Sequence, residues 1–340
     1  MTTKGEERRR RAGTKLSANV SVGNNIVVAS NQPEFLSNDD NKEELIHLLM
    51  DNLQSTGHTA IKCPADADET ITSRALQFDS GPKVVVVCKD TDVLAMLVAR
   101  SKRRTRILVL HPSTSKTGGK VFDISVIQKT IGNMKECLLF AHAFTGCDAT
   151  SALFGKGKKQ AWSKLKNSTT LREEVKIFES SKVTKPSVIA SGEKFAIALY
   201  DSDNANCKTL DELRVIKYSR KIAMQPVTAS FQLAVLPPTS AACAQHSLRV
   251  YLQVQEWLGK TLNPQEWGWK SLENALLPVP TTLPPAPDHL LNLISCNCKS
   301  TCGKNCDCVR AGLQCSLMCG HCRGSTCLNT NYDGSDDEED

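Results

Sequence analysis

Apolar residues recur three and four positions apart in several parts of the chain, a spacing that predicts amphipathic helices. In KEELIHLLMDNL they occupy positions 45, 46, 48, 49 and 53. The segment 66–76 adds a proline just before it and acidic residues in its first turn, which are start signals for a helix. The helices predicted in this way cover residues 42–53, 66–76, 93–99, much of 138–165 and 241–258.

Short apolar runs without helical spacing lie between the first of these helices. Val84–Cys88 is entirely apolar and rich in β-branched residues, and Ile107–Leu110 is a similar run. Such runs are typical of strands that are buried on both faces of a parallel sheet. HTAIKC, at 58–63, is predicted as a further short strand. Because strands and helices alternate here, the predicted fold class is α/β with a parallel sheet.

Composition divides the 340 residues into six segments. At about 100–200 residues per domain, this length predicts two or three domains. Five prolines between 278 and 288 indicate a stiff linker. The segments are a basic, irregular stretch (1–40), an α/β core (41–165), a helical extension (166–277), the proline-rich linker (278–290), a small cysteine-rich module (291–330) and an acidic tail (331–340).

Charge is unevenly distributed. The net charge is +6, although six acids lie in the last eight residues, and Arg8–Arg11 form an unbroken basic run. A basic body suits a polyanionic partner, of which nucleic acid is the commonest. The alternative is that terminal charge runs are only solvated tails. No apolar run approaches the ~20 residues of a membrane span, and the charged N-terminus is unlike a signal peptide, so we expect an intracellular protein with no membrane partner.

Carboxylates follow the predicted strands and open the predicted helices. Ligand sites in open α/β sheets form at the carboxyl ends of strands, where several carboxylates repel one another unless a divalent cation such as Mg²⁺ or Mn²⁺ binds them. Two such ions can support phosphodiester hydrolysis. The alternative is that these acids only cap helices. The candidate residues are Asp66, Asp68, Asp90, Asp92 and Asp148.

The text CPADADETITSRALQFDSGPKVVVVCKDTDVLAML is similar to an internal region of the flap-endonuclease (XPG-like, PIN-like) nucleases. In that family a P-[ST]-E-A-E-A helix is followed by a strand that ends in D-x-D. The resemblance implies a PIN-like parallel sheet flanked by helices and a Mg²⁺- or Mn²⁺-dependent, structure-selective nuclease. It implies that Asp66 and Asp68 stand for the two glutamates, and that Asp90 and Asp92 stand for the strand-end pair.

The text HAFTGCDATSALFGKGKKQAW resembles a second element of that family. The resemblance implies that Asp148 is its last metal-binding aspartate. It also implies that Gly155 and Gly157 form a helix–hairpin–helix turn on a DNA phosphate, where nearby lysines add further phosphate contacts. A tight connection between two helices is the alternative. The lysines are Lys156, Lys158 and Lys159.

The resemblance is incomplete at its start. Two further metal-binding aspartates of the family come from earlier strands, whereas MTTKGEERRRRAG resembles the basic helix that follows those strands. Residues 1–330 also resemble transposon-associated, XPG-like proteins that end in a cysteine-rich module. Three expectations stay open: an active nuclease, a nuclease-derived DNA-binding protein that no longer cuts, and a poorly folded transposon-derived fragment.

Nine of the fifteen cysteines lie between 296 and 327, and nine is an odd number, which excludes a complete disulfide framework. Zinc takes four thiolates, so three zinc ions need twelve positions, which nine cysteines supply if three of them bridge. The alternative is a two-zinc site in which His321 replaces a thiolate. The predicted ligands are Cys296, Cys298, Cys302, Cys306, Cys308, Cys315, Cys319, Cys322 and Cys327.

CNCKSTCGKNCDCVRAGLQCSLMCGHCRGSTCLN resembles the CXC (tesmin/TSO1-type) domain. The resemblance implies contact with DNA or chromatin, and therefore the nucleus. The family's base-contacting tyrosine is Asn305 here, which leaves non-specific contact with the DNA backbone as the expectation. The alternative is a purely structural zinc module. The basic residues expected to contact DNA, or to compensate the cluster's charge, are Lys299, Lys304, Arg310 and Arg323.

Overall fold

The computed structural model of the chain divides into two compact units, Met1–Thr281 and Thr282–Asp340. The basic run at 8–11, the end of the predicted linker (284–290) and the acidic tail lie outside the described residues. In the part of the chain that the structure describes, none of the helices has both the length and the apolar character needed to cross a membrane. The described residues are 18–27, 31–36, 38–63, 66–78, 81–113, 118–201, 206–224, 233–272, 275–283, 296, 298–299, 302–311, 314–315, 319, 321–324 and 326–329.

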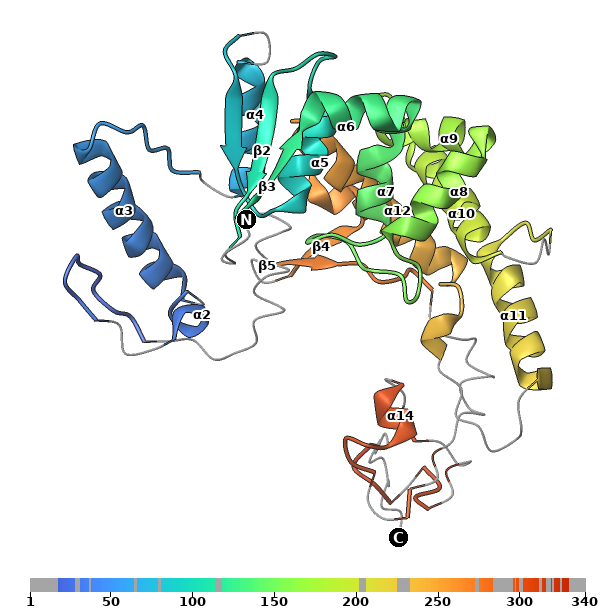
Figure 1. Cartoon of the computed structure of the whole chain (residues 1–340). Coiled ribbons are helices and arrows are strands. Elements are labelled where there is room, and N and C mark those ends of the chain that lie inside the picture. The colour runs from blue at the N-terminus through green and yellow to red at the C-terminus, as the bar shows by residue number, and fades with distance from the viewer. Residues whose placement is uncertain are drawn as a thin grey trace. The chain divides into compact units, whose positions relative to one another are not determined.

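The first half of the larger unit alternates helices and strands (Figure 1). The helices predicted at 42–53, 66–76 and 93–99 are confirmed as α3, α4 and α5. HTAIKC forms no strand, so that prediction is wrong. The helical elements of this half are α2 (Gln32–Phe35), α3 (Asp39–Ser55), α4 (Ala67–Gln77), α5 (Thr91–Arg100), α6 (Ile124–Ile131), the 3₁₀ segment η1 (Gly132–Cys137) and α7 (Leu138–Phe144).

A three-stranded sheet, in the order β1-β2-β3, joins these helices. The strands are β1 (Val84–Val87), β2 (Ile107–His111) and β3 (Lys120–Asp123). β1 and β2 are parallel, with Val84 opposite Ile107, as predicted. β3 runs antiparallel to β2, so the sheet is mixed and the prediction of a purely parallel sheet is wrong. The fold class is therefore mixed α/β.

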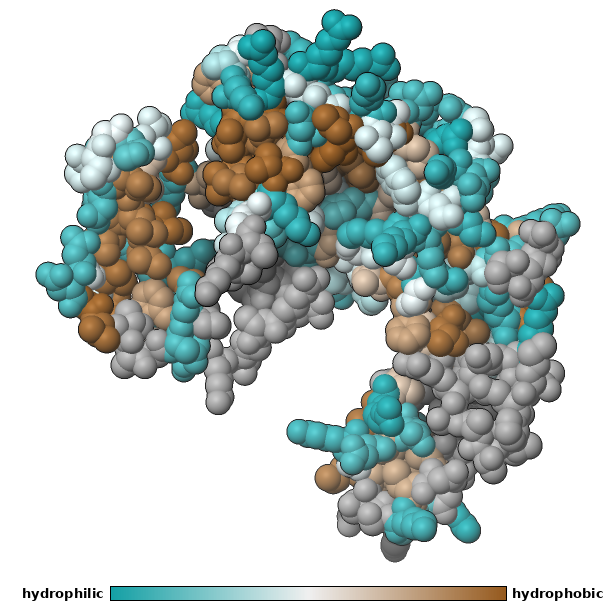
Figure 2. Space-filling model, viewed as in Figure 1, coloured by the Kyte–Doolittle hydropathy of each residue, from teal (hydrophilic) through white to brown (hydrophobic). Residues whose placement is uncertain are grey.

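One face of the sheet is buried and the other is open. Val86, Ile107 and Val109 belong to the same buried core as α5 and α7. Val85 and Val87 are 53% and 62% exposed, so the prediction that Val84–Cys88 is buried on both faces is wrong. Figure 2 shows hydrophobic residues gathered at the surface over the strands. Among the described residues, the helices that cover the sheet do so from one side.

The second half of the larger unit is a helical bundle. The predicted helix at 241–258 is confirmed as α12, which packs against α7 and α10. Phe140 and Phe144 of α7 contact Phe195 of α10 edge-on, with ring centroids 4.8 and 5.0 Å apart. The helical elements of the bundle are α8 (Lys158–Asn167), α9 (Thr169–Val175), η2 (Lys176–Phe178), α10 (Lys185–Tyr200), α11 (Leu210–Met224), η3 (Leu233–Val235), α12 (Ser240–Trp257) and η4 (Pro264–Glu266).

A β-hairpin ends this unit. β4 (Trp269–Leu272) pairs antiparallel with β5 (Ala275–Pro278), with Trp269 opposite Pro278. The segment 166–277 is therefore not purely helical. Trp269 is 2% exposed and belongs to the main core, so the hairpin is anchored on the bundle by its first residue.

The α10–α12 contact depends on the absence of a side chain at Gly192. A Cβ atom at this position would lie 2.6 Å from Ser247 Cβ of α12 and closer still to Ser247 Oγ. We expect Gly192→Ala to lower the free energy of unfolding by about 1–3 kcal/mol, because it overpacks the core. Urea unfolding measures the change. In the double variant Gly192→Ala/Ser247→Gly, removal of the Ser247 side chain should relieve much of this penalty. If the stability losses of the two single variants simply add in the double variant, the proposed contact is contradicted.

Candidate metal centres

The smaller unit is built around sulfur atoms. Its only described helix is the single turn α14 (Asp307–Arg310), and the buried residues that form its described core are all cysteines. All fifteen cysteines of the chain are free thiols, and none forms a disulfide. The described residues of this core contribute no hydrocarbon side chains and little hydrophobic stabilisation, and a metal ion held by the thiols would supply folding free energy.

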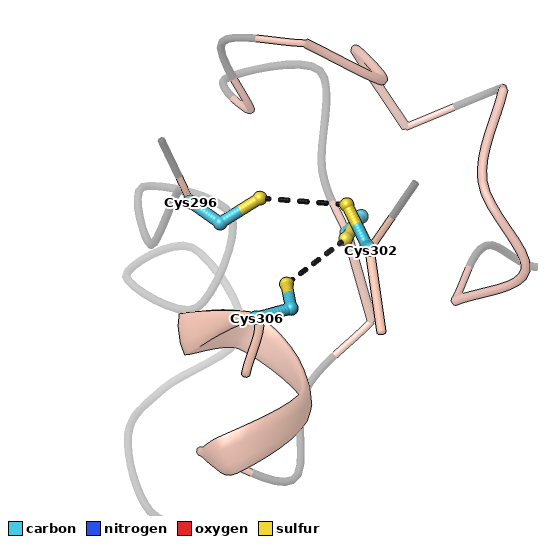
Figure 3. Close-up of side chains that lie close together, drawn as sticks. Cys296, Cys302 and Cys306 are labelled. Atoms are coloured by element: carbon cyan, nitrogen blue, oxygen red, sulfur yellow. Dashed lines mark hydrogen bonds between the residues drawn. The ribbon is translucent and has the colours of Figure 1, made fainter. Parts of the chain in front are cut away.

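The spacing of the sulfur atoms matches tetrahedral zinc. The Sγ atoms of Cys296 and Cys302 lie 3.7 Å apart, and those of Cys308 and Cys319 lie 3.6 Å apart. Four sulfurs placed tetrahedrally at the Zn–S distance of ~2.3 Å lie about 3.8 Å from one another. Figure 3 shows Cys296 and Cys302 pointing toward each other, with Cys306 beside them. These distances are too long for a covalent S–S bond and suit ligands of a shared ion.

The cysteines form three groups of four that could each hold a metal ion. Within each group, all four Sγ atoms lie within 4.8 Å of one another. Cys315 belongs to all three groups, while Cys296 and Cys302 each belong to two. Cys298 belongs to none of them, although it packs against the cluster and interacts with Cys296, Cys302 and Cys306. The groups are Cys296–Cys302–Cys306–Cys315, Cys296–Cys308–Cys315–Cys319 and Cys302–Cys315–Cys322–Cys327.

The thiols of this cluster differ in acidity. Loss of water and the neighbouring Cys319 thiol raise the pKa of Cys308 to about 12. A hydrogen bond from the backbone N–H of Val309 is the main cause that lowers the pKa of Cys306 to about 6. Zinc binds thiolates, so binding has to displace protons from the high-pKa thiols. A cation held at the centre would supply the positive charge that lets several thiolates share this volume.

The carboxylate centre lies where two helices begin. Asp68 is in the first turn of α4, Asp90 is the N-cap of α5, and Asp92 is in the first turn of α5. Oxygen atoms of these three residues lie within 4.8 Å of one another. Asp68 and Asp92 are buried. The partial positive charge at each helix N-terminus favours carboxylates here.

Capping and metal binding are not exclusive alternatives at this centre. Asp90 Oδ1 accepts a hydrogen bond from the N–H of Asp92 at 2.8 Å, so Asp90 does cap α5. Asp66 occupies the N-cap position of α4, yet its side chain forms no capping hydrogen bond. Asp66 and Asp148 lie outside the three-carboxylate group. The structure therefore brings together three of the five predicted acids.

His142 is a residue of this centre that the sequence interpretation did not single out. Its Nε2 lies 2.7 Å from Asp92 Oδ1, and both side chains are largely buried. A histidine that donates to a carboxylate fixes the orientation of that carboxylate, as residues around metal ligands commonly do. The available signal was one polar residue inside the apolar helix LLFAHAF.

A turn lies between α7 and α8, at the position where the sequence predicts contact with a phosphate. Gly155 has φ +66°, in the left-handed region that favours glycine, and Leu153 pairs with Lys156 across the turn. Lys158 Nζ donates to the carbonyl oxygens of Gly146 at 2.7 Å and His142 at 3.2 Å, so Lys158 holds the turn in place.

The other two lysines of the turn differ in their surroundings. The Lys156 ammonium lies over the Tyr200 ring, 5.1 Å from its centroid, and burial is the main cause that lowers its pKa. Lys159 is exposed at the start of α8. Of the three lysines, Lys159 is the most accessible to a phosphate.

Exposed basic residues surround the sulfur cluster. Arg310 Nη1 lies 4.0 Å from Asp307 Oδ1, and both side chains are exposed. The exposed basic residues described in this unit include Lys299, Lys304, Arg310 and Arg323.

Comparisons with protein-family models, curated proteins and solved structures found no match.

Glu256 of α12 is a further carboxyl group, and it interacts electrostatically with Asp66 at the N-terminal end of α4. Burial raises its pKa to about 7, and the charge of Asp66 contributes. The folded chain therefore holds a proton that the unfolded chain releases between pH 4.5 and 7, and this contribution to stability is lost as the pH rises through about 7.

We expect Glu256→Gln to increase the free energy of unfolding by about 1–3 kcal/mol at pH 8, because glutamine carries no charge to bury. The gain should vanish at pH 4, where the Glu256 carboxyl is mostly protonated in both the folded and the unfolded chain. Urea unfolding at the two pH values measures it, and Glu266→Gln, at an exposed site, is the control. An equal gain at both pH values would contradict the assigned pKa.

Proposed function

We propose that this chain is a zinc-dependent nucleic-acid-binding protein, derived from a Mg²⁺-dependent flap-type nuclease. The observation that carries the proposal is the three overlapping four-sulfur groups, in a unit whose described core consists of cysteines. Such a unit needs metal to fold. Contact with DNA or chromatin would place the protein in the nucleus.

The sulfur positions suggest a specific three-zinc arrangement. A thiolate that serves three ions is crowded, and Cys298 contacts the other members of the first group, so Cys298 replaces Cys315 there. Cys296, Cys302 and Cys315 then each bridge two ions, and the remaining six cysteines each bind one. The three sets are Cys296–Cys298–Cys302–Cys306, Cys296–Cys308–Cys315–Cys319 and Cys302–Cys315–Cys322–Cys327.

Nucleic-acid binding is supported by the charge around the cluster. Three Zn²⁺ and nine thiolates sum to −3, and four exposed basic residues of this unit offset that charge. They provide contacts to the phosphate backbone without reading bases. The purely structural alternative, a zinc module with no ligand, is separated from this proposal by a binding measurement.

Nuclease activity is the second candidate, and the proximity of Asp68, Asp90 and Asp92 favours it. Carboxylate oxygens suit Mg²⁺ or Mn²⁺, and an ion held there would polarise a phosphodiester. His142 would orient Asp92, and Lys159 would contact a phosphate of the substrate. The non-cutting alternative keeps the same body as a DNA-binding scaffold.

The bridging arrangement makes a stoichiometric prediction. Native mass spectrometry of the full chain should count three zinc ions. Cys315→Ser should lose two of them and Cys298→Ser at most one, because Cys315 bridges two ions and Cys298 binds one. Fewer than three ions in the unmodified chain, or equal losses in the two variants, would reject the arrangement.

Cleavage of flap and bubble DNA, assayed with Mg²⁺ or Mn²⁺, tests the second candidate. We expect Asp92→Asn to abolish cleavage and His142→Gln to weaken metal binding by about 10–100-fold, as loss of a partner of a ligand does. Asp123→Asn, which alters the N-cap of α6 away from the carboxylate group, is the control. Zinc-dependent DNA binding without cleavage would support the non-cutting protein, and cleavage that survives Asp92→Asn would rule out this centre.

A further inference from the structure

One face of the three-stranded sheet carries a continuous row of aliphatic side chains. Val85 pairs with Leu108, and Val87 pairs with Leu110. Leu110 in turn pairs with Val121 of β3. Paired residues of neighbouring strands point to the same face of a sheet, so these five residues together form its open face. Val87 and Val121 are 62% and 59% exposed, so the described residues leave much of this face uncovered.

Helix α3, in the same unit, has an apolar stripe that is also uncovered. The stripe consists of Leu45, Ile46, Leu49 and Leu53, which share one side of the helix. Leu49 and Leu53 are 52% and 46% exposed, and Asn41 is the only buried residue of α3. Figure 2 shows hydrophobic residues at the surface along α3 as well as over the strands. Contiguous apolar surface of this kind marks a site of contact.

The stripe and the open face match in length and are joined closely enough to meet. From Leu45 to Leu53 the stripe spans about 12 Å, and a four-residue strand spans about 13 Å. α3 ends at Ser55 and α4 begins at Ala67. The intervening segment 56–66 can extend over about 36 Å. Such a tether keeps the stripe at a high local concentration near the sheet of its own chain, which favours this sheet over that of a second copy.

Chain direction and charge agree with contact between the two. α4 begins beside the carboxylates, at the edge where β1 ends, so the tethered C-terminal end of α3 comes to that edge. The N-terminal end of α3 then comes to the opposite edge, where Lys83 precedes β1 and Arg106 precedes β2. Both are exposed and lie two positions before open-face residues, so they extend on the same side. The first two turns of α3 carry the complementary charges, Asp39, Asp40, Glu43 and Glu44.

We propose that α3 docks by its apolar stripe on the open face of its own chain, running parallel to β1. The contact removes both apolar surfaces from water, which the hydrophobic effect favours. The acids at the start of α3 then lie beside Lys83 and Arg106. Because α5 packs on the other face, the sheet gains a helix on each side, as α/β sheets commonly have. Neither candidate metal centre takes part, so this inference goes beyond the function proposed above.

Photocrosslinking of the full chain tests the contact. With p-benzoylphenylalanine in place of Val87, irradiation should join this position to the stripe of α3 within one chain. The product should run as a monomer in denaturing electrophoresis, and mass spectrometry of its peptides should locate the bond in α3. The same probe in place of Val126 should not react with α3, because Val126 is 58% exposed on α6, which packs with α5 on the covered side of the sheet.

Paired variants of α3 separate docking from chance encounter. With the probe at position 87, Leu49→Gln/Leu53→Gln should lower the crosslink yield to that of the Val126 control, since glutamine retains the helix propensity of leucine but not its apolar surface. His47→Gln/Asp51→Gln, on the exposed polar side of α3, should leave the yield unchanged. Equal yields from the two variants, or no crosslink from position 87 to α3, would overturn the proposal. Crosslinks only between two chains would also overturn it and would assign the open face to a second copy.

Discussion

Electrostatic repulsion between ligand groups in their ionised form governs both candidate metal centres. Thiols in the smaller unit and carboxylates in the larger unit lie within 4.8 Å of their neighbours, closer than charged groups stay without compensation. The protein lowers this repulsion in part, through helix N-termini at Asp68 and Asp92 and a backbone N–H at Cys306. A bound cation would offset the residual repulsion, and both groups have ligand atoms close enough together to hold one.

The sheet separates two kinds of charge. The carboxylates lie where β1 ends and α5 begins, and exposed arginines lie where α5 ends and β2 begins. One crossover helix, α5, thus connects an acidic edge to a basic edge, and its buried residues Val93, Met96 and Leu97 fix it in the core. Packing of this helix therefore sets the geometry of both edges at once.

Periodicity predicted the elements that depend on local pattern and missed those that depend on tertiary contacts. The spacing in α3, α4, α5 and α12 and the apolar run of β1 are local signals, and each was correct. The exposure of Val85 and Val87 depends on what covers the sheet, which a single run of residues does not encode.

The same limit applies to the sites. Strand-end and helix-start positions predicted that five acids meet, of which Asp68, Asp90 and Asp92 do and Asp66 and Asp148 do not, and cysteine spacing predicted a shared sulfur cluster. His142 and Glu256 acquire their roles from partners 50 or more positions away, so sequence pattern gave no reason to choose them. The antiparallel return of β3 was missed because its four residues KVFD carry little strand signal.

X-ray absorption at the zinc edge of the purified full chain tests the central claim most directly. The account predicts that every zinc ion has four sulfur neighbours at ~2.3 Å and a second zinc within scattering range. Nitrogen or oxygen in the inner coordination sphere, or zinc ions without a nearby second metal, would contradict it.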